Sequence, residues 1–385
     1  MNRTAKTIVT VVLLAALGGA VFFALRGTQQ EQLASGQNPT LSLPGLRGMQ
    51  TVELTGVIAL DVEPYFKDPR VIKALSDHGF KLNVTRIGSR DMAQRVVQSG
   101  GPDFMFPSGI VAANQILDAA KRANQTGTQY TPFYTPMVIA SWKPIAAILQ
   151  ANGLATPLTG GSGGAFSVDL AKLVALMQAK TRWKDMKAAS AFDVNKSVLV
   201  STTDVRKSNS GAMYLALAAY ALNNNEVPID RGTAELVAKK AADLFKRQGY
   251  QENYVNGNFD DYVAIGIGKT PMAFIYENQM IAYALSKPVA ADMTLLYPNP
   301  TIVNKVVFVA MNERSKRLGD LLTTHAELLN IGLEYGFRTS DSAAFLQKVQ
   351  AAKLGVDEKL NHLIDPPSFE TMSLMIDVVT REMSQ

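Results

Sequence analysis

Residues 201–211 bring together the side chains of this sequence that are best suited to binding a small molecule. The run reads Ser-Thr-Thr-Asp-Val-Arg-Lys-Ser-Asn-Ser-Gly, and an apolar segment with helical spacing follows it directly. Hydroxyls, an amide and two cations placed here can act together with the free N–H groups of the helix's first turn, which attract negative charge. We therefore predict ligand contacts from Thr202, Thr203, Asp204, Arg206, Ser208, Asn209 and Ser210.

Two further turns between a predicted strand and a predicted helix carry similar chemistry. Ser89 and Arg90 follow Gly88, which allows close backbone approach, and Arg90 offers a fork of donors suited to an oxyanion. Ser108 opens another helix. A serine before a helix is also an ordinary N-cap, which stabilises by roughly 1 kcal/mol without any ligand. For Ser89 and Ser108 both interpretations stay open, whereas the cluster at 201–211 favours a ligand because one cap needs only one hydroxyl.

Three side chains at the ends of later strands could line the same site. Tyr276 and Glu277 end the predicted strand 270–279, and Tyr297 ends the next one. Glu277 would repel a simple anion, so it could instead receive a cationic or amino group. A solvated strand end is the alternative interpretation for these residues.

Strands and helices alternate along the chain from residue 51. Strands are predicted at 51–60, 81–89 and 102–109, and helices at 69–79, 90–100 and 110–124. This βαβαβα order predicts a parallel sheet with helices on both faces, and therefore an α/β fold. Open sheets of this kind bind ligands at the carboxyl ends of their strands.

The rest of the chain continues the alternation and ends in helices. Further strands are predicted at 130–142, 197–204, 270–279, 293–298 and 304–312. Further helices are predicted at 143–153, 167–180 (with Ser167 as its cap), 211–223, 232–249, 318–336, 341–355 and 368–385. The glycine-rich stretch 156–166 is predicted to be a flexible break.

The order of these features resembles a type 2 periplasmic substrate-binding protein, the group that includes phosphate- and molybdate-binding proteins of ABC transporters. The resemblance covers roughly residues 51–345 and is carried by TPMVIASW, STTDVRKSNSGAMYLAL, TPMAFIYENQ, LLYPNPTIVNKVVFVAMN and YGFR. It implies two lobes: 51–140 as the first part of lobe 1, 141–275 as lobe 2, 276–345 as the return to lobe 1, and 346–385 as C-terminal helices that the resemblance does not place. Strands near 136–142 and 271–277 would be the hinge. Arg206, Ser208, Ser210 and Gly211 are similar to the anion-binding turn of phosphate-binding proteins, but Asn209 and Ala212 depart from it.

The first 26 residues predict membrane association. The uncharged run at 8–25 reaches roughly 27 Å as a helix, close to the thickness of a bilayer core. Arg3 and Lys6 precede it and place the N-terminus in the cytoplasm. The length favours one uncleaved transmembrane anchor over a cleaved signal peptide. Residues 27–50 are polar and rich in Gly, Ser and Gln, and so predict a flexible tether.

Composition excludes several classes of function. The chain has no cysteine, which excludes disulfides, thiolate nucleophiles, cysteine-ligated metals and a lipoprotein anchor. The formal charge of +5 includes the three cations around the apolar run, so the near-neutral remainder argues against nucleic acid. A G-x-S-x-G match at 160–164 lacks the strand and helix that a nucleophile elbow needs. The three histidines are scattered, with no metal-spaced pair, and neither a metal nor a cofactor is expected.

We therefore expect a non-enzymatic solute-binding protein on the outer face of a bacterial inner membrane. It would capture a small ligand, an oxyanion being one candidate, in a hinged cleft for uptake by an ABC permease. The alternative is a membrane-anchored sensor or assembly partner that keeps the binding-protein fold and contacts another envelope protein.

Overall fold

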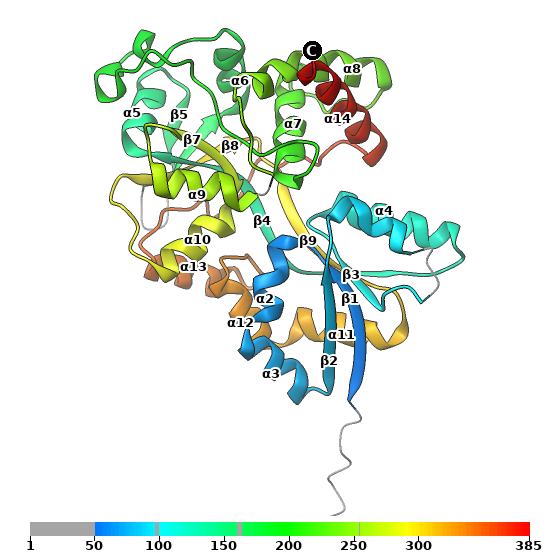
Figure 1. Ribbon diagram of the computed structural model, residues 1–385. Helices are drawn as coiled ribbons and strands as arrows, with labels where there is room; N and C mark the ends of the chain where they lie inside the picture. The colour runs from blue at the N-terminus through cyan, green and yellow to red at the C-terminus, as the bar shows by residue number, and fades with distance from the viewer. Residues whose placement is uncertain (1–50, 97–99, 160–163, 254) are drawn as a thin grey trace, which may run out of the picture. The chain divides into compact units, whose positions relative to one another are not determined.

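The computed structural model of the protein describes residues 51–96, 100–159, 164–253 and 255–385. Residues 51–385 form one compact unit (Figure 1). The predicted membrane segment at 8–25 and the predicted tether at 27–50 lie outside the described residues. Among the helices that are described, none is both long and apolar enough to cross a bilayer.

The first sheet has the strand order β2–β1–β3–β9–β4. Its strands are β1 (Val52–Ile58), β2 (Phe80–Arg86), β3 (Phe104–Phe106), β9 (Val303–Ala310) and the first part of β4 (Thr128–Trp142). β1 pairs in parallel with β2 and β3, which confirms the parallel sheet predicted from the alternation. β9 is antiparallel to both β3 and β4. The carboxyl ends of the three parallel strands therefore meet at one edge, where a ligand can bind.

Alternation along β3 shows how this sheet is covered on both faces. Phe104 and Phe106 lie in one buried core together with Leu54 and Phe308, whereas Met105 lies in a second core with Ile116. Successive side chains of a strand point to opposite faces, so each of these three residues must reach a different layer from its neighbour. The sheet, its two cores and the helices that cover them, α3 (Pro69–Asp77), α4 (Ile110–Arg122), α11 (Glu313–Thr324) and α12 (Ala326–Glu334), are called lobe 1 below.

The second sheet consists of the remainder of β4 with β7 (Met272–Tyr276), β8 (Met293–Asn299), β6 (Phe166–Asp169) and β5 (Ala155–Pro157). It has its own large core, which contains both tryptophans. Its helices are α5 (Lys143–Ala151), α6 (Leu170–Gln178), α7 (Asn209–Leu222), α8 (Arg231–Lys246) and α9 (Val255–Ile265). This second sheet and its helices are called lobe 2.

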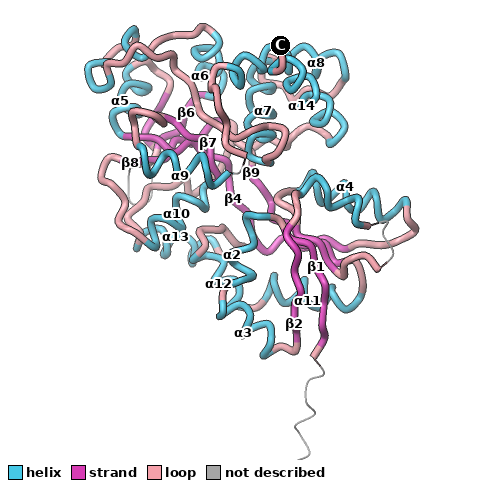
Figure 2. The backbone as a smooth tube through the Cα atoms, viewed as in Figure 1, coloured by secondary structure: helices cyan, strands magenta, loops and turns pink. Residues whose placement is uncertain are grey.

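Strand β4 belongs to both sheets. Thr128 to Pro136 pair with β9 in lobe 1, and Met137 to Ser141 pair with β7 in lobe 2 (Figure 2). The chain returns to lobe 1 only with β9, because β8 still pairs with β4 and β6. The predicted division of the lobes at 140, 275 and 345 stays a prediction, but the long strand at 130–142 is confirmed.

Several predicted elements differ from the structure, and tertiary contacts explain the differences. The segment 197–204 is no regular strand, since only Ser201 bridges to β7, while Thr202 donates its N–H to the side chain of Gln248. Helix α6 begins after Asp169 rather than Ser167, because Ser167 pairs with Tyr297 in the sheet. The stretch 156–166 is partly built into β5 and β6, and its residues 160–163 lie outside the described ones.

Two predicted helices also have different forms. The segment 90–100 contains the 3-10 helix η2 (Ser89–Arg95), whose first turn is tightened by the bond from the Asp91 N–H to the Gly88 carbonyl. The helix predicted at 318–336 is two helices, α11 and α12, because His325 adopts an extended backbone between them. The remaining helices of the described chain are η1 (Leu60–Val62), α2 (Glu63–Lys67), η3 (Trp183–Asp185), η4 (Ala189–Phe192), α10 (Glu277–Ser286), α13 (Ser342–Ala351) and α14 (Phe369–Met383).

The C-terminal helix α14 lies beside α7 and α8 of lobe 2 and reaches α4 of lobe 1 (Figure 1). Ser368 caps it by accepting the N–H of Thr371. Met372, Met375 and Val379 bury its apolar side in the core of lobe 2. The resemblance did not place this helix, and its position brings the end of the chain to both lobes.

Candidate functional site

A cavity of about 490 Å³ has walls from both lobes and from α14. Lobe 1 contributes the residues after β1, β2 and β3 together with the first turns of α4. Lobe 2 contributes the turn at 206–213, Asn253 and Tyr276. The remaining wall is formed by Phe369, Met372, Ser373 and Ile376 of α14. The cavity therefore lies at the carboxyl ends of the parallel strands, where the sheet order places a ligand site.

The polar wall of lobe 1 is organised around Ser108. Its hydroxyl donates to Oδ1 of Asp61 at 2.5 Å, and its backbone N–H donates to Oγ of Ser89 at 2.9 Å. Burial raises the pKa of Asp61, and the hydrogen bond from Ser108 lowers it only in part. Both predicted serines thus line the cavity. Asp61, which the sequence did not single out, lines it too, and its charge helps to raise the pKa of Tyr276.

The predicted turn at 201–211 divides between the cavity and the protein interior. Thr203 and Ser210 are fully buried, and their hydroxyls lie 2.7 Å apart. Ser210 is also 2.8 Å from the hydroxyl of Ser208, which does line the cavity. The three hydroxyls therefore form a chain that ties the turn to the start of α7. Gly211 is required here, because a Cβ at this position would lie 2.6 Å from the Thr203 carbonyl oxygen.

Two charges of this turn, those of Arg206 and Asp204, are paired with each other. Arg206 lines the cavity and holds the buried Asp204 through Nε and a terminal nitrogen. Burial raises the pKa of Asp204, but the bonds from Arg206 outweigh that effect and leave the pKa below its ordinary value. Thr202 is buried behind the turn and is absent from the cavity wall as described. The structure thus brings Arg206, Ser208 and Asn209 to the cavity, whereas Thr202, Thr203, Asp204 and Ser210 support them from behind.

Asn209 connects the two lobes at the base of the cavity. Its Nδ2 donates to the Tyr276 hydroxyl at 2.9 Å and to Oδ1 of Asn304, on β9 of lobe 1, at 3.3 Å. Gly109, the residue before α4, is close enough that a Cβ there would lie 2.8 Å from that same Asn304 oxygen. Burial, and then the charge of Asp61, raise the pKa of Tyr276, so its hydroxyl stays protonated and available as a donor. The predicted contact residue Tyr276 lines the cavity.

Glu277 lies away from this cavity, in a buried ion pair. Arg338 donates from Nε and a terminal nitrogen to the two Glu277 oxygens, each at 2.7 Å, and the Tyr297 hydroxyl donates to the same carboxylate at 2.5 Å. Arg338 also donates to the Asp357 carbonyl at 2.6 Å. The cationic group predicted to face Glu277 is therefore Arg338 of the chain itself. Neither Glu277 nor Tyr297 is among the residues that line the cavity.

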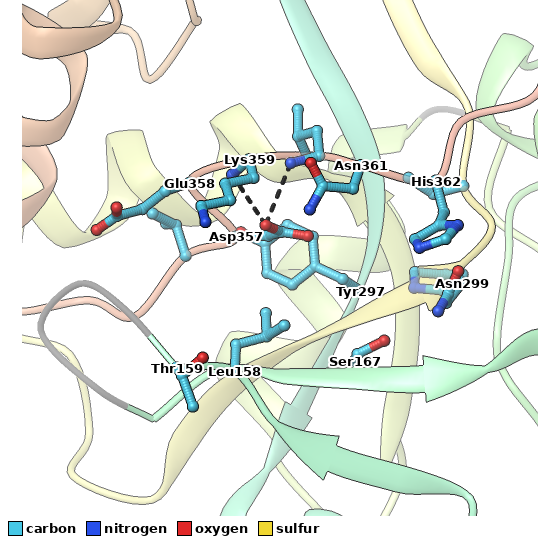
Figure 3. Close-up of a pocket in the computed structure, with 14 residues that line it drawn as sticks. Leu158, Thr159, Ser167, Tyr297, Asn299, Asp357, Glu358, Lys359, Asn361 and His362 are labelled. Carbon is cyan, nitrogen blue, oxygen red and sulfur yellow. Dashed lines mark hydrogen bonds between the residues drawn. The ribbon is translucent and has the colours of Figure 1, made fainter.

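Tyr297 instead forms the floor of a smaller pocket of about 300 Å³ (Figure 3). The loop 356–362 covers it, and Oδ1 of Asp357 accepts the backbone N–H groups of Lys359 and Leu360. Glu358 points away from the pocket in Figure 3. The loop is thus held by its own hydrogen bonds, and the pocket is bordered by Thr159, next to residues 160–163 that lie outside the described part.

Arg90 is the remaining residue that was predicted to contact the ligand. The backbone of Arg90 lies in η2, and its side chain is outside the described part of the structure.

The prediction that the histidines are scattered is wrong for two of them, since Nε2 of His78 and Nε2 of His325 lie 2.9 Å apart. Their 247-residue separation hid this contact from the sequence. Within the described residues, no group of three or more metal-ligating side chains is present.

The cavity also contains residues that sequence reasoning missed. Asp61 lies in η1, shortly after the end of β1 at Ile58, where parallel sheets place ligands, so its position was the signal available. The residues of α14 gave a weaker signal, since an apolar helix at the end of a chain does not indicate what it will pack against.

Comparison with known proteins identifies the fold. No protein-family model and no curated protein sequence matches the chain. Among solved structures, a substrate-binding protein of an ABC transporter from Agrobacterium tumefaciens is 15% identical, covers 90% of this chain and 100% of its own length, and has a TM-score of 0.50. The fold is that of ABC-transporter substrate-binding proteins.

Two further structures support this assignment of the fold. An ABC transporter solute-binding protein from Thermotoga lettingae, bound with α-D-tagatose, is 13% identical over 86% of this chain and 94% of its own, with a TM-score of 0.52. A protein described as a spermidine/putrescine ABC transporter from Listeria monocytogenes is 12% identical over 86% of this chain and 98% of its own, with a TM-score of 0.53. The chain is thus a mixed α/β protein with the two-lobed binding-protein fold, as the resemblance implied.

Proposed function

We propose that this protein captures a small ligand in the cavity between its two lobes and presents it to an ABC-type permease. The observation that carries the proposal is the cavity itself. It is built where the carboxyl ends of β1, β2 and β3 face the start of α7, and its volume of about 490 Å³ lies within the range of small-molecule sites. The structures of similar fold are binding proteins of ABC transporters, which supports the same role for this chain.

The binding step would be a closure of the two lobes around the ligand. Strand β4 is hydrogen-bonded in both sheets, so a small rotation within it at residues 136–137 would move one lobe relative to the other. The contact of Asn209 with Asn304 joins the lobes, so it would form on closing and break on opening, whereas Tyr276 belongs to lobe 2 together with Asn209. This role uses no catalytic group, and we assign the protein no enzymatic activity.

The N-terminal run at 8–25 supports a location on the outer face of the inner membrane. An apolar run preceded by cations directs the following chain outward. Such an anchor would keep the binding unit beside its permease. We propose that the run is retained as an anchor, which N-terminal sequencing of the protein isolated from membranes would test.

Thermal unfolding of the full-length chain with a ligand panel tests the binding function. The panel contains phosphate, sulfate and molybdate, then sugars, amino acids and amines. A ligand at about 100 times its Kd stabilises the folded state by about 2.7 kcal/mol, which raises the Tm measurably. No shift from any class would contradict solute capture and favour the alternative role as an envelope sensor or assembly partner.

A pair of variants on one helix locates the site. Ala112 lines the cavity, so Ala112→Trp should fill it and remove the ligand-induced shift. Asp118 lies on the exposed side of the same helix, so Asp118→Trp should keep the shift. Loss of the shift in both variants, or in neither, would place the ligand elsewhere.

A further inference from the structure

The charges around the cavity are distributed unevenly between its wall and its rim. Asp61 is partly buried, one of its oxygens accepts the Ser108 hydroxyl, and no cation of the described chain pairs with it. Three cations also line the cavity, Arg86, Arg206 and Lys207, and all three are exposed. Arg86 pairs with Glu63 at 3.0 Å, and Arg206 pairs with Asp204. Asp91 and Lys207 also line the cavity without an ion pair among the described residues, but both are exposed to solvent, whereas Asp61 is partly buried.

A carboxylate in this position needs a partner when the cavity closes. Removing a charge from water is costly unless an opposite charge or several hydrogen bonds replace the lost hydration. Hydrogen bonds from the Ser108 hydroxyl and from the backbone N–H groups of Asp61 and Val62 lower the Asp61 pKa, but burial raises it by more. A cationic hydrogen-bond donor on the ligand would supply the rest, whereas an oxyanion beside Asp61 would be repelled.

A second part of the cavity offers almost no hydrogen bonds. Met372 and Ile376 of α14, both nearly inaccessible to water, line it together with Met213 of α7 and Val111 of α4. Ser373 is the polar member of this helix among the residues that line the cavity. Methionine and aliphatic side chains accommodate apolar groups of varied shape. This part of the wall therefore suits a hydrocarbon portion of the ligand.

We propose that the cavity selects an amine with an apolar body, whose ammonium group binds Asp61 and whose hydrocarbon portion packs against α14. This inference deepens the proposed function and rests on it. The ammonium would donate to the Asp61 oxygen that Ser108 leaves open, and to Tyr276 or Ser89 around it. Asp61 and α14 then act as specificity determinants, one for charge and one for shape.

Matched compounds test the two halves separately on the full-length chain, by thermal unfolding and by titration calorimetry. Phenethylamine carries both features, 2-phenylethanol replaces the ammonium by a hydroxyl, and ethanolamine removes the apolar body. We expect stabilisation by phenethylamine and at least about tenfold weaker binding of the other two. Equal binding of 2-phenylethanol overturns the charge assignment, and equal binding of ethanolamine overturns the role of α14.

Two aspartates, one in the cavity and one outside it, provide a matched pair of variants. Asp61→Asn keeps the shape and a hydrogen-bonding oxygen but removes the charge, so affinity for phenethylamine should fall roughly tenfold or more. Asp118 is exposed on α4 and does not line the cavity, and Asp118→Asn should change the affinity less than about threefold. Similar losses in both variants would overturn the assignment to Asp61. The Tm of each variant without ligand shows whether it is folded.

The same measurements separate this inference from the proposed function. If phosphate, a sugar or another non-amine stabilises the chain and Asp61→Asn leaves that effect unchanged, solute capture stands and the amine specificity fails. If Ala112→Trp also leaves every effect unchanged, the cavity is not the site and both fail. Absence of any shift from phenethylamine, with other ligands active, overturns the amine inference alone.

Discussion

Replacing Arg338 by methionine would remove the cation from the most deeply buried ion pair in the described part of the chain. The side chains of Arg338 and Glu277 are 5% and 0% exposed, respectively. Arg338 follows α12, whereas Glu277 starts α10 directly after β7, so the pair joins distant parts of the chain beside the strand shared by both lobes. Methionine keeps most of the side-chain volume and can still pack on the Phe345 ring, which lies 4.5 Å from the guanidinium.

The expected cost follows from the groups left behind. Arg338→Met leaves the Glu277 carboxylate buried with only the Tyr297 hydroxyl as donor, and breaking one side of a buried pair costs about 3–5 kcal/mol. Glu277→Met should cost a similar amount. In the double variant no charge remains, and the principal loss is the partner of Tyr297, about 1–3 kcal/mol. The double-mutant cycle should therefore give a coupling of about 3 kcal/mol or more.

Urea unfolding of the full-length chain provides the assay, followed by circular dichroism and by the fluorescence of the two buried tryptophans, Trp142 and Trp183. Lys348→Met is the control, because Lys348 and Glu334 form a partly exposed pair whose loss should cost about 1 kcal/mol or less. A cost for Arg338→Met no larger than that of Lys348→Met would refute the reasoning. So would a double variant whose cost equals the sum of the single ones.

Two further predictions concern acid stability and closure of the lobes. Burial raises the pKa of Asp103, but hydrogen bonds and charge from the Thr55 N–H and from Arg314 outweigh this effect and lower the pKa. The ionised Asp103 therefore stabilises the fold above the unfolded pKa of about 3.9, and this stabilisation is lost as pH falls through the folded pKa. Asp103→Asn should therefore lose less stability than the native chain between pH 5 and pH 3 in urea unfolding, and an equal loss would contradict the assignment. Gly109→Ala should weaken ligand binding roughly tenfold by calorimetry, because the new Cβ would lie 2.8 Å from Asn304, which takes part in the contact between the lobes. Gly268→Ala is the control and should bind normally, because a Cβ at that position has no atom within 4 Å.

The local pattern of the sequence determined most of the elements and the class of fold. Alternating apolar residues predicted β1, β2 and β3 with the helices between them, and the long strand at 130–142, because a strand or helix must bury one face whatever its neighbours are. The order of these elements then implied a parallel sheet, and the resemblance to type 2 periplasmic substrate-binding proteins added the two lobes. Six of the predicted contact residues line the cavity: Ser89, Ser108, Arg206, Ser208, Asn209 and Tyr276. They could be predicted because the ends of strands and the starts of helices are visible in the sequence.

Only the tertiary structure decided which of the polar residues face the cavity and which face each other. Thr203 and Ser210 share a hydrogen bond, and Glu277 pairs with Arg338, 61 residues away. These partners could not be predicted, because a buried polar group forms hydrogen bonds with whichever groups the packing places beside it. The same is true of α14, whose apolar face could have packed against any exposed core. Its docking across lobe 2 to α4 gives the cavity a wall that no spacing of residues along the chain could have indicated.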